Sequence, residues 1–165
     1  MKYKKLNVGS GRHYAKGYLN IDIDPNTKHD MICDITKTSF KDNTFDEVRC
    51  INVFEHLYNY MDALKEIWRI LVMGGVLKFR VPMAMTVSQY AVIDHVSEFV
   101  PQAFIKQHKR YGYAFKPKVW TTPALIYKNK FMKFHFRWMY FNIIFPIFTG
   151  IEGELTKVPM ASIPD

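Results

Sequence analysis

Short apolar runs separated by polar turns fill the first half of the chain, and one helical repeat interrupts them. Four runs have the length and composition of strands: Leu6–Val8, Tyr18–Asp24, Met31–Ile35 and Phe45–Val53. After Asp62, which we expect to cap a helix, apolar residues recur at helical spacing until Met73–Gly75 ends it. Val76–Val81 is the next predicted strand, closed by Pro82. This alternation predicts an α/β fold with parallel strands at the centre of the sheet.

The first connection is too short for an ordinary crossover helix. Only Arg12–Gly17 separate Gly11 from the second strand, whereas a crossover that carries a helix takes about ten residues or more. We therefore expect a first helix that is very short or replaced by a loop. The pattern of the second half predicts two helices and three strand-like segments: Val87–Val96 and Pro101–Arg110, then Val119–Lys128, Phe131–Tyr140 and Ile151–Val158.

The composition is that of one globular domain, which we place over residues 1–165. The 165 residues are long enough for a real core, and 48% of them are hydrophobic. Cys33 and Cys50 are isolated in strand-like runs, so we expect reduced core thiols and neither a disulfide framework nor a metal site. Met1–Lys5 lead into a strand without the apolar segment of a secretory signal, which predicts a cytoplasmic protein.

The net charge of +8 is concentrated in the second half. Residues 1–100 carry 13 Lys and Arg against 12 Asp and Glu, whereas residues 101–165 carry 10 against 3. This asymmetry indicates either an anionic partner, such as nucleic acid, a phosphorylated substrate or a membrane surface, or simply a solvated basic face.

Two successive strands end in residues suited to a nucleoside. Leu6–Gly11 runs from a strand into a glycine turn, and Leu19–Asp24 ends in carboxylates. Glycines let backbone N–H groups approach a ligand closely, and a carboxylate at the end of a second strand can accept both ribose hydroxyls. The pattern predicts a nucleoside-cofactor site.

Four collinear blocks resemble the class I S-adenosylmethionine-dependent methyltransferases of the type 11 group. The first two are the glycine loop Leu6–Gly11 and the acidic segment Asn20–Pro25. The third runs from Asp34 through Phe45-Asp46-Glu47-Val48 to Val53-Phe54-Glu55-His56-Leu57, and the fourth is Ala63–Leu71 with Gly74-Gly75. Together the blocks span residues 6–82. The resemblance implies a Rossmann-like sheet of about seven strands, mostly parallel with an antiparallel last strand.

The resemblance also implies where the cofactor S-adenosylmethionine binds, within a cofactor-binding half over residues 1–82. Gly9 and Gly11 would line its methionine part, Asp22 or Asp24 would accept the ribose hydroxyls, and Asp34 would accept from the adenine amino group. The other implied cofactor residues are Asn7, Val8, Ser10, Ile23, Ile35, Ile51 and Asn52. The family usually has an acidic residue where Asn7 stands.

Residues 83–165 would supply the last strands and the substrate side. His56 stands at the family's histidine position, and His95 follows Asp94 as in an acid–base pair, so both are candidate substrate residues beside the alternative of structural histidines. A sulfonium methyl is already activated and needs mainly in-line positioning of the acceptor. The pattern therefore names neither the methyl acceptor, whether small molecule, glycan or nucleic acid, nor a catalytic residue.

The segment 101–148 holds nine Lys and Arg, no acidic residue and fourteen aromatic residues. Three interpretations stay open: base stacking with phosphate contacts, peripheral contact with an anionic membrane, or ordinary packing under a solvated basic surface. Phe141–Phe148 is too short for a transmembrane span.

Two other functions compete with the methyltransferase. The same fold could bind the cofactor without turnover, as a scaffold protein. A nicotinamide-dependent oxidoreductase is disfavoured because Gly9–Tyr14 lacks the third glycine of the dinucleotide fingerprint and a helix behind it.

Overall fold

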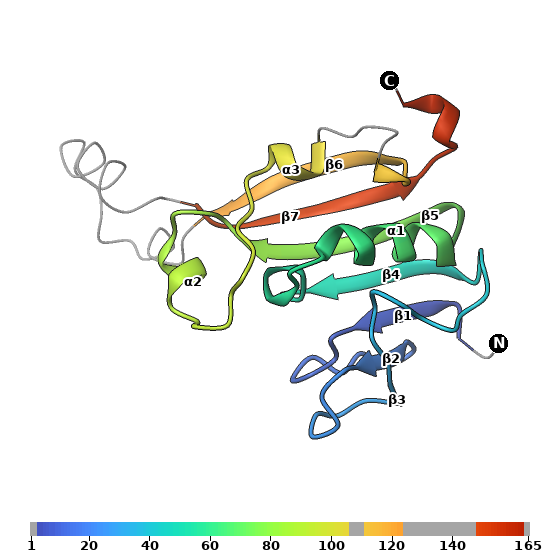
Figure 1. Cartoon of the computed structure of the whole chain (residues 1–165), viewed down its shortest axis with the longest axis horizontal. Helices are drawn as coiled ribbons and strands as arrows, with labels where there is room; N and C mark the ends of the chain where they lie inside the picture. Colours follow the sequence, from blue (N-terminus) through green and yellow to red (C-terminus); the bar gives the residue numbers. More distant parts are fainter. Residues whose placement is uncertain (1–2, 106–110, 124–147, 164–165) are drawn as a thin grey trace.

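A computed structural model describes residues 3–105, 111–123 and 148–163 as a seven-stranded sheet with helices packed on it (Figure 1). The strands are β1 (Lys5–Val8), β2 (Leu19–Asp22), β3 (Met31–Ile32), β4 (Phe45–Ile51), β5 (Leu71–Pro82), β6 (Phe115–Pro123) and β7 (Phe148–Lys157). The helices are α1 (Tyr60–Ile70), α2 (Val87–Tyr90) and α3 (Gln102–Ile105), with short 3-10 turns η1 (Phe54–His56) and η4 (Met160–Ser162).

The strand order is β3-β2-β1-β4-β5-β7-β6. β1 lies between β2 and β4, and every pairing from β3 to β5 is parallel. β7 runs antiparallel to both of its neighbours, β5 and β6. The chain therefore reverses its direction of winding at β1 and β4, where open α/β sheets bind ligands. The predicted fold class is confirmed, including the antiparallel last strand.

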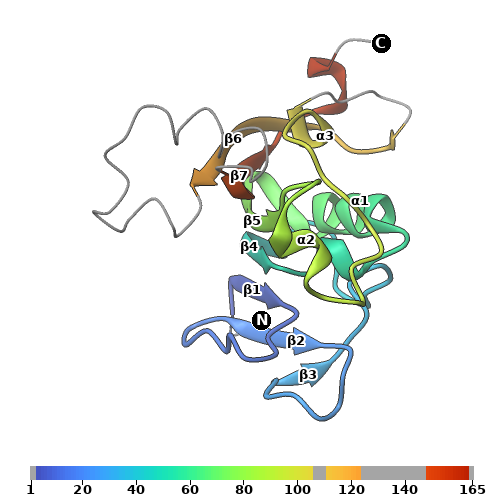
Figure 2. The same cartoon turned by 90° about the vertical axis from the view of Figure 1, so that its left-hand side faces the viewer.

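One face of the sheet carries the helices and the core. Figure 2 shows α1 and α3 on the same side of the strands. The residues that α1 buries recur at helical spacing: Ala63, Leu64, Ile67 and Ile70. They pack in one cluster with the inward residues of β4 and β5, among them Val48, Cys50 and Leu77. Burying each large aliphatic side chain stabilises the fold by about 2 kcal/mol.

The opposite face of the central strands is charged. Lys78 and Arg80 alternate along β5 with buried Leu77, Phe79 and Val81. On this face Lys78 forms an ion pair with Glu47 of β4 at 2.8 Å, and Arg80 forms one with Glu152 of β7 at 2.9 Å. In the described ranges no helix is long and apolar enough to cross a membrane.

A network of polar side chains stands where the first crossover helix would be. The Asn7 amide nitrogen donates to the carbonyl of His13 at 3.0 Å and to Asn20 Oδ1 at 2.9 Å. Asn20 also accepts from the Ala15 N–H and donates to the Ala15 carbonyl. The side chain of Asp30 in turn accepts from the Asn20 N–H at 2.8 Å. The pair Asn7–Asn20 thus satisfies loop backbone groups that a helix would satisfy internally, which explains how the predicted short connection is built.

Several predicted helix boundaries are wrong. α1 begins at Tyr60 after Asn59, so Asp62 lies inside its first turn and does not cap it. The helix ends at Ile70 because Leu71 is already extended and pairs with Phe45 in the sheet. Met73–Gly75, which was predicted to end the helix, therefore lies within β5.

One predicted helix of the second half is also shorter than expected. The one predicted over Val87–Val96 closes at Tyr90, because the Gln89 carbonyl oxygen accepts from the His95 ring instead of a helical N–H. α3 confirms the described part of the helix predicted over Pro101–Arg110, whose residues 106–110 lie outside the described residues. The prediction over residues 131–140 lies outside the described residues, as does the end of the strand predicted from Val119.

Glu66 and Arg69 of α1 form a bidentate ion pair, and both side chains also bond to the loop before β4. Arg69 Nη2 and Nε lie 2.6 and 2.8 Å from the two carboxylate oxygens of Glu66, and Arg69 also contacts Asp42. Glu66 Oε1 accepts from the N–H of Thr38 at 2.9 Å and from its hydroxyl at 2.6 Å. Burial works against the charged carboxylate, but these hydrogen bonds from Arg69 and Thr38 outweigh it and lower the pKa of Glu66.

This network predicts acid sensitivity. A folded-state pKa below the ordinary value of 4.5 stabilises the protein above that pH, and the stabilisation is lost as the pH falls through the folded value. We expect Glu66→Gln to lower the free energy of unfolding at pH 7 by about 2 kcal/mol, which is the typical contribution of a hydrogen bond to a charged group. Urea titrations should show this difference shrinking below pH 4.5, whereas a constant difference would contradict the assignment. Exposed Glu98 serves as the control position, where Glu98→Gln should change little.

Candidate functional site

The carboxyl ends of the parallel strands meet at one edge of the sheet, where the arrowheads of β1 and β4 point in the same direction (Figure 1). The loops that follow β1 to β4 contain every residue that the sequence predicts for the cofactor, apart from those inside the strands themselves. Residues distant in the chain are therefore brought to a common edge by strand order alone.

Asp22 is the most constrained of the predicted acidic residues. It is the last residue of β2, and only 8% of its surface is exposed. Its Oδ2 accepts from the Gly11 N–H at 2.7 Å, and its Oδ1 accepts from the Asp24 N–H at 3.0 Å. A carboxylate has about four acceptor positions, so two stay available for other donors. The two backbone bonds fix the carboxylate beside the glycine turn.

Gly9 brings the loop after β1 against the loop after β4. Its φ of +60° lies in the left-handed region, and a Cβ on it would come 2.4 Å from Val53 Cγ2. Ser10 next to it is fully buried, with its hydroxyl donating to the Lys28 carbonyl at 2.8 Å. Gly11 also has positive φ, and its Cβ would lie 3.8 Å from Asp22 Oδ2. The turn therefore requires glycine for close packing as well as for its backbone conformation.

The predicted residues inside β1 lie in the interior. Asn7 is 1% exposed and Val8 is 3% exposed. Asn7 uses its amide N–H groups on His13 and Asn20, as described above, so it stabilises the glycine turn from beneath. Its assignment to the cofactor stays a prediction.

The remaining acidic residues form local turns. Asp24 Oδ1 accepts from the N–H of Asn26 at 2.8 Å, and Asp34 Oδ1 accepts from the N–H and the hydroxyl of Thr36, both at 2.8 Å. Asp24 and Asp34 are exposed. Of the predicted apolar neighbours, Ile23 is 67% exposed and Ile35 is 4% exposed. Asp34 and Ile35 follow β3 and stand at the same edge as Asp22, and Ile23 and Asp24 immediately follow Asp22.

The loop after β4 begins with a strained residue. Ile51 ends the strand, and Asn52 has a φ of +54°, with its N–H donating to the Arg80 carbonyl at 2.9 Å. Positive φ in a residue other than glycine costs free energy and is concentrated at functional sites. Asn52 thereby turns the chain from β4 into η1 and the pocket described next.

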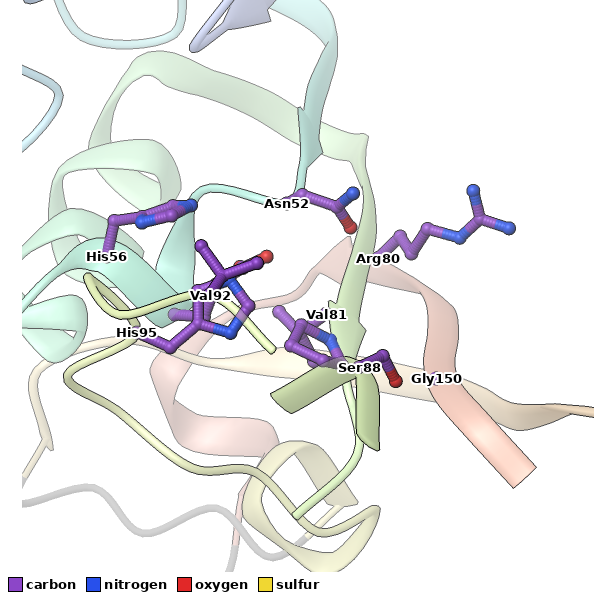
Figure 3. Close-up of a pocket in the computed structure, with 10 residues that line it drawn as sticks. Asn52, His56, Arg80, Val81, Ser88, Val92, His95 and Gly150 are labelled. Carbon is purple, nitrogen blue, oxygen red and sulfur yellow. The ribbon is translucent and has the colours of Figure 1, made fainter. Parts of the chain in front are cut away.

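A pocket of about 390 Å³ opens beside this loop. It is lined by Asn52, Glu55, His56, Arg80, Val81, Pro82, Ser88, Val92, His95 and Gly150. Figure 3 shows His56 and His95 on one side of the pocket and Arg80 extending away on the other. The rings of the two histidines are in edge contact, with centroids 4.9 Å apart. The two predicted substrate residues are thus in contact, although they come from separate segments of the chain.

Glu55 was not singled out from the sequence, and it is the most unusual group in the pocket. It is 1% exposed, and burial raises its pKa to about 7, with a smaller contribution from the charge of Asp94. Within the ranges that the structure describes, Glu55 Oε2 has no hydrogen-bond partner. In the sequence, Glu55 is marked only by its place before His56 in the block Val53–Leu57 that resembles the family.

Sequence comparisons match part of the chain to a known family and to one relative. The sequence model of a family described as a methyltransferase domain matches residues 8–79. An uncharacterized protein of Methanocaldococcus jannaschii, MJ0638, is 57% identical over 51 residues, which are 30% of this chain and 22% of that protein. The matched segment therefore spans only about a fifth of that relative's length.

Solved structures share the fold over nearly the whole chain. A SAM-dependent methyltransferase from Archaeoglobus fulgidus superposes with a TM-score of 0.71 at 15% identity, covering 94% of this chain and 86% of that chain. Phosphoethanolamine N-methyltransferase 2 of Haemonchus contortus, solved with S-adenosyl-L-methionine, gives 0.66 at 15% identity, covering 96% of this chain and 50% of that chain.

The fold and the family match together define the class. Residues 8–79 match the model of a methyltransferase domain, and the chain has the Rossmann-like fold of the solved S-adenosylmethionine-dependent methyltransferases. The resemblance to the type 11 group that the sequence motifs carry is confirmed.

Proposed function

We propose that the protein transfers a methyl group from S-adenosylmethionine to an acceptor bound in the pocket of Glu55, His56 and His95. The single observation that carries the proposal is the joining of the glycine turn to Asp22 at the switch point of the sheet, by the 2.7 Å hydrogen bond from the Gly11 N–H. The bond holds a carboxylate beside the glycine turn, where the hydroxyls of a bound ribose could reach it.

The residues at this edge fit the cofactor. Asp22 keeps acceptor positions for the ribose hydroxyls, and a side chain at Gly11 would stand over that carboxylate. Asp34 would accept from the adenine amino group, and both of its local hydrogen bonds use Oδ1. Ile51 and Asn52 would contact the methionine end, next to the acceptor pocket. Asn7 supplies no charge for the methionine ammonium, so we expect backbone groups of the glycine turn to hold that end.

Bound S-adenosylmethionine would supply a methyl group that is already activated by its sulfonium. The chain then has to orient the acceptor and manage one proton. His56 and His95 have nitrogen atoms in the pocket, and Ser88 and Asn52 add polar groups to its lining. The pocket has the volume of a small-molecule site, and the positive charge of residues 101–165 favours an anionic acceptor.

The test combines binding with turnover. S-adenosylhomocysteine should give saturable heat in isothermal titration, and labelled methyl should pass from S-adenosylmethionine to an anionic acceptor in a panel of sugar phosphates and RNA. Uncharged sugars and the same assays at high salt are the controls, since screening weakens a charged acceptor's binding. No binding at millimolar S-adenosylhomocysteine would overturn the proposal. Binding without transfer to any acceptor would leave a cofactor-binding protein instead.

A further inference from the structure

Two histidines and one carboxylate form a compact cluster at the pocket. One ligand atom each from Glu55, His56 and His95 lies within 4.8 Å of the others. The residues come from η1 and from the segment after α2, so the tertiary fold and not the sequence brings them together (Figure 3). Imidazole nitrogens and a carboxylate oxygen are common ligands of divalent transition metals.

The surroundings of both rings leave a lone pair on Nε2. His95 Nδ1 lies 2.8 Å from the Gln89 carbonyl oxygen, and His56 Nδ1 lies 3.1 Å from Asp94 Oδ2. Both partners are acceptors, so each neutral ring donates its proton from Nδ1. Metal-binding histidines are held in this way, with one nitrogen bonded to a carbonyl or carboxylate oxygen and the other directed at the metal.

Glu55 supplies a buried carboxylate with one oxygen that lacks a hydrogen-bond partner among the described residues. It is 1% exposed, and its Oε2 has no hydrogen-bond partner in residues 3–105, 111–123 and 148–163. A buried polar atom without a partner is costly, and a cation is a partner that removes the cost. Arg80, the one Lys or Arg among the described residues that line the pocket, pairs with Glu152 at 2.9 Å and extends away from the histidines (Figure 3).

We propose that Glu55, His56 and His95 bind one divalent first-row transition metal ion, with Zn²⁺ as the ion to test. Ligand atoms about 2.0–2.2 Å from a tetrahedral ion lie about 3.3–3.6 Å from one another. The three groups now lie within 4.8 Å of one another, so the proposal requires their side chains to draw closer when the ion binds. Three protein ligands leave at least one coordination position open to the pocket. The proposal does not depend on the methyltransferase activity.

The experiment is a titration of the full chain with zinc chloride, without a polyhistidine tag and after treatment with a chelator. We expect one equivalent to bind, and we expect Glu55→Gln, His56→Gln and His95→Gln each to weaken binding at least tenfold. His13→Gln is the matched control, because His13 is exposed and outside the cluster. Thermal melting without metal checks that each variant folds. Binding that is absent, or equally tight in the three variants, would overturn the proposal.

A second measurement needs no variant of the cluster. In long-range nitrogen–proton spectra of the wild-type imidazoles, zinc should shift Nε2 of two histidines while their Nδ1 stays protonated. Shifts of any other pair of histidines, or of none, would contradict the site. Both measurements are made without S-adenosylmethionine, so their failure leaves the proposed function standing, and the failure of that function leaves the metal site standing.

Discussion

Gly9→Ala should lower the free energy of unfolding by about 3 kcal/mol. The left-handed backbone costs a residue with a Cβ about 1 kcal/mol, and the contact with Val53 adds an overpacking cost of about 2 kcal/mol. The clash is severe because the new Cβ would come 2.4 Å from Val53 Cγ2. Urea unfolding measures the loss. The same variant should weaken S-adenosylhomocysteine binding, since the clash separates the loops after β1 and β4.

Two further variants separate the causes. Gly17 has a φ of +88°, and a Cβ on it would meet nothing within 4 Å, so Gly17→Ala should show the backbone cost alone, about 1 kcal/mol. Adding Val53→Ala to Gly9→Ala removes the clashing methyl group and should recover part of the loss in a double-mutant cycle. Equal losses for Gly9→Ala and Gly17→Ala, with no coupling to Val53, would contradict the packing that we describe.

Asp22→Asn should weaken S-adenosylhomocysteine binding about 100-fold. The substitution keeps the shape but removes the charge and one acceptor oxygen, and two hydrogen bonds to a charged group are worth about 3 kcal/mol. Isothermal titration measures the affinity, and thermal melting checks the fold, because the carboxylate also accepts from the N–H groups of Gly11 and Asp24.

Asp24→Asn is the matched control for that prediction. Asp24 is an exposed carboxylate two residues away, bonded to the N–H of Asn26. We expect its substitution to change the affinity less than about threefold, within the range of a screened surface charge. A larger effect at Asp24 than at Asp22 would contradict this prediction and would assign the ribose hydroxyls to Asp24.

The sequence was sufficient for the fold class because its blocks matched the topology in order. The strands at Leu6–Val8 and around Phe45 were clear from their apolar runs, and the short first connection followed from counting the residues between Gly11 and Tyr18. The role of Asn7 was not accessible in this way. Its partners His13 and Asn20 are set by how the loop closes, and an asparagine in a strand pattern carries no sign of that closure.

Element ends were less predictable because tertiary contacts decide them. Asp62 has the residue type of a helix cap, yet the helix starts two residues earlier, and Leu71 leaves the helix to pair with Phe45. α2 is short because the Gln89 carbonyl is used by His95. Local helix propensity describes none of these competing contacts.

In the acceptor pocket, the sequence identified single residues but not the contacts between them. His56 and His95 were chosen one by one, from a family position and from a neighbouring acid, and neither reason implies that their rings touch. Glu55 could not be recognised as an unpaired carboxylate, since burial and hydrogen bonding are properties of the folded chain. The cofactor residues remain predictions that share one edge of the sheet.

The most direct test of the account is to locate S-adenosylhomocysteine on the full-length chain by nitrogen–proton NMR. We expect its addition to shift the backbone amides of Gly9 and Gly11 in the glycine turn, of Asp24 beside the Asp22 carboxylate, and of Ile35 after β3. Shifts confined to the outward sheet face around Trp120, or no shifts at saturating ligand, would contradict a cofactor site at the carboxyl edge of β1 to β4.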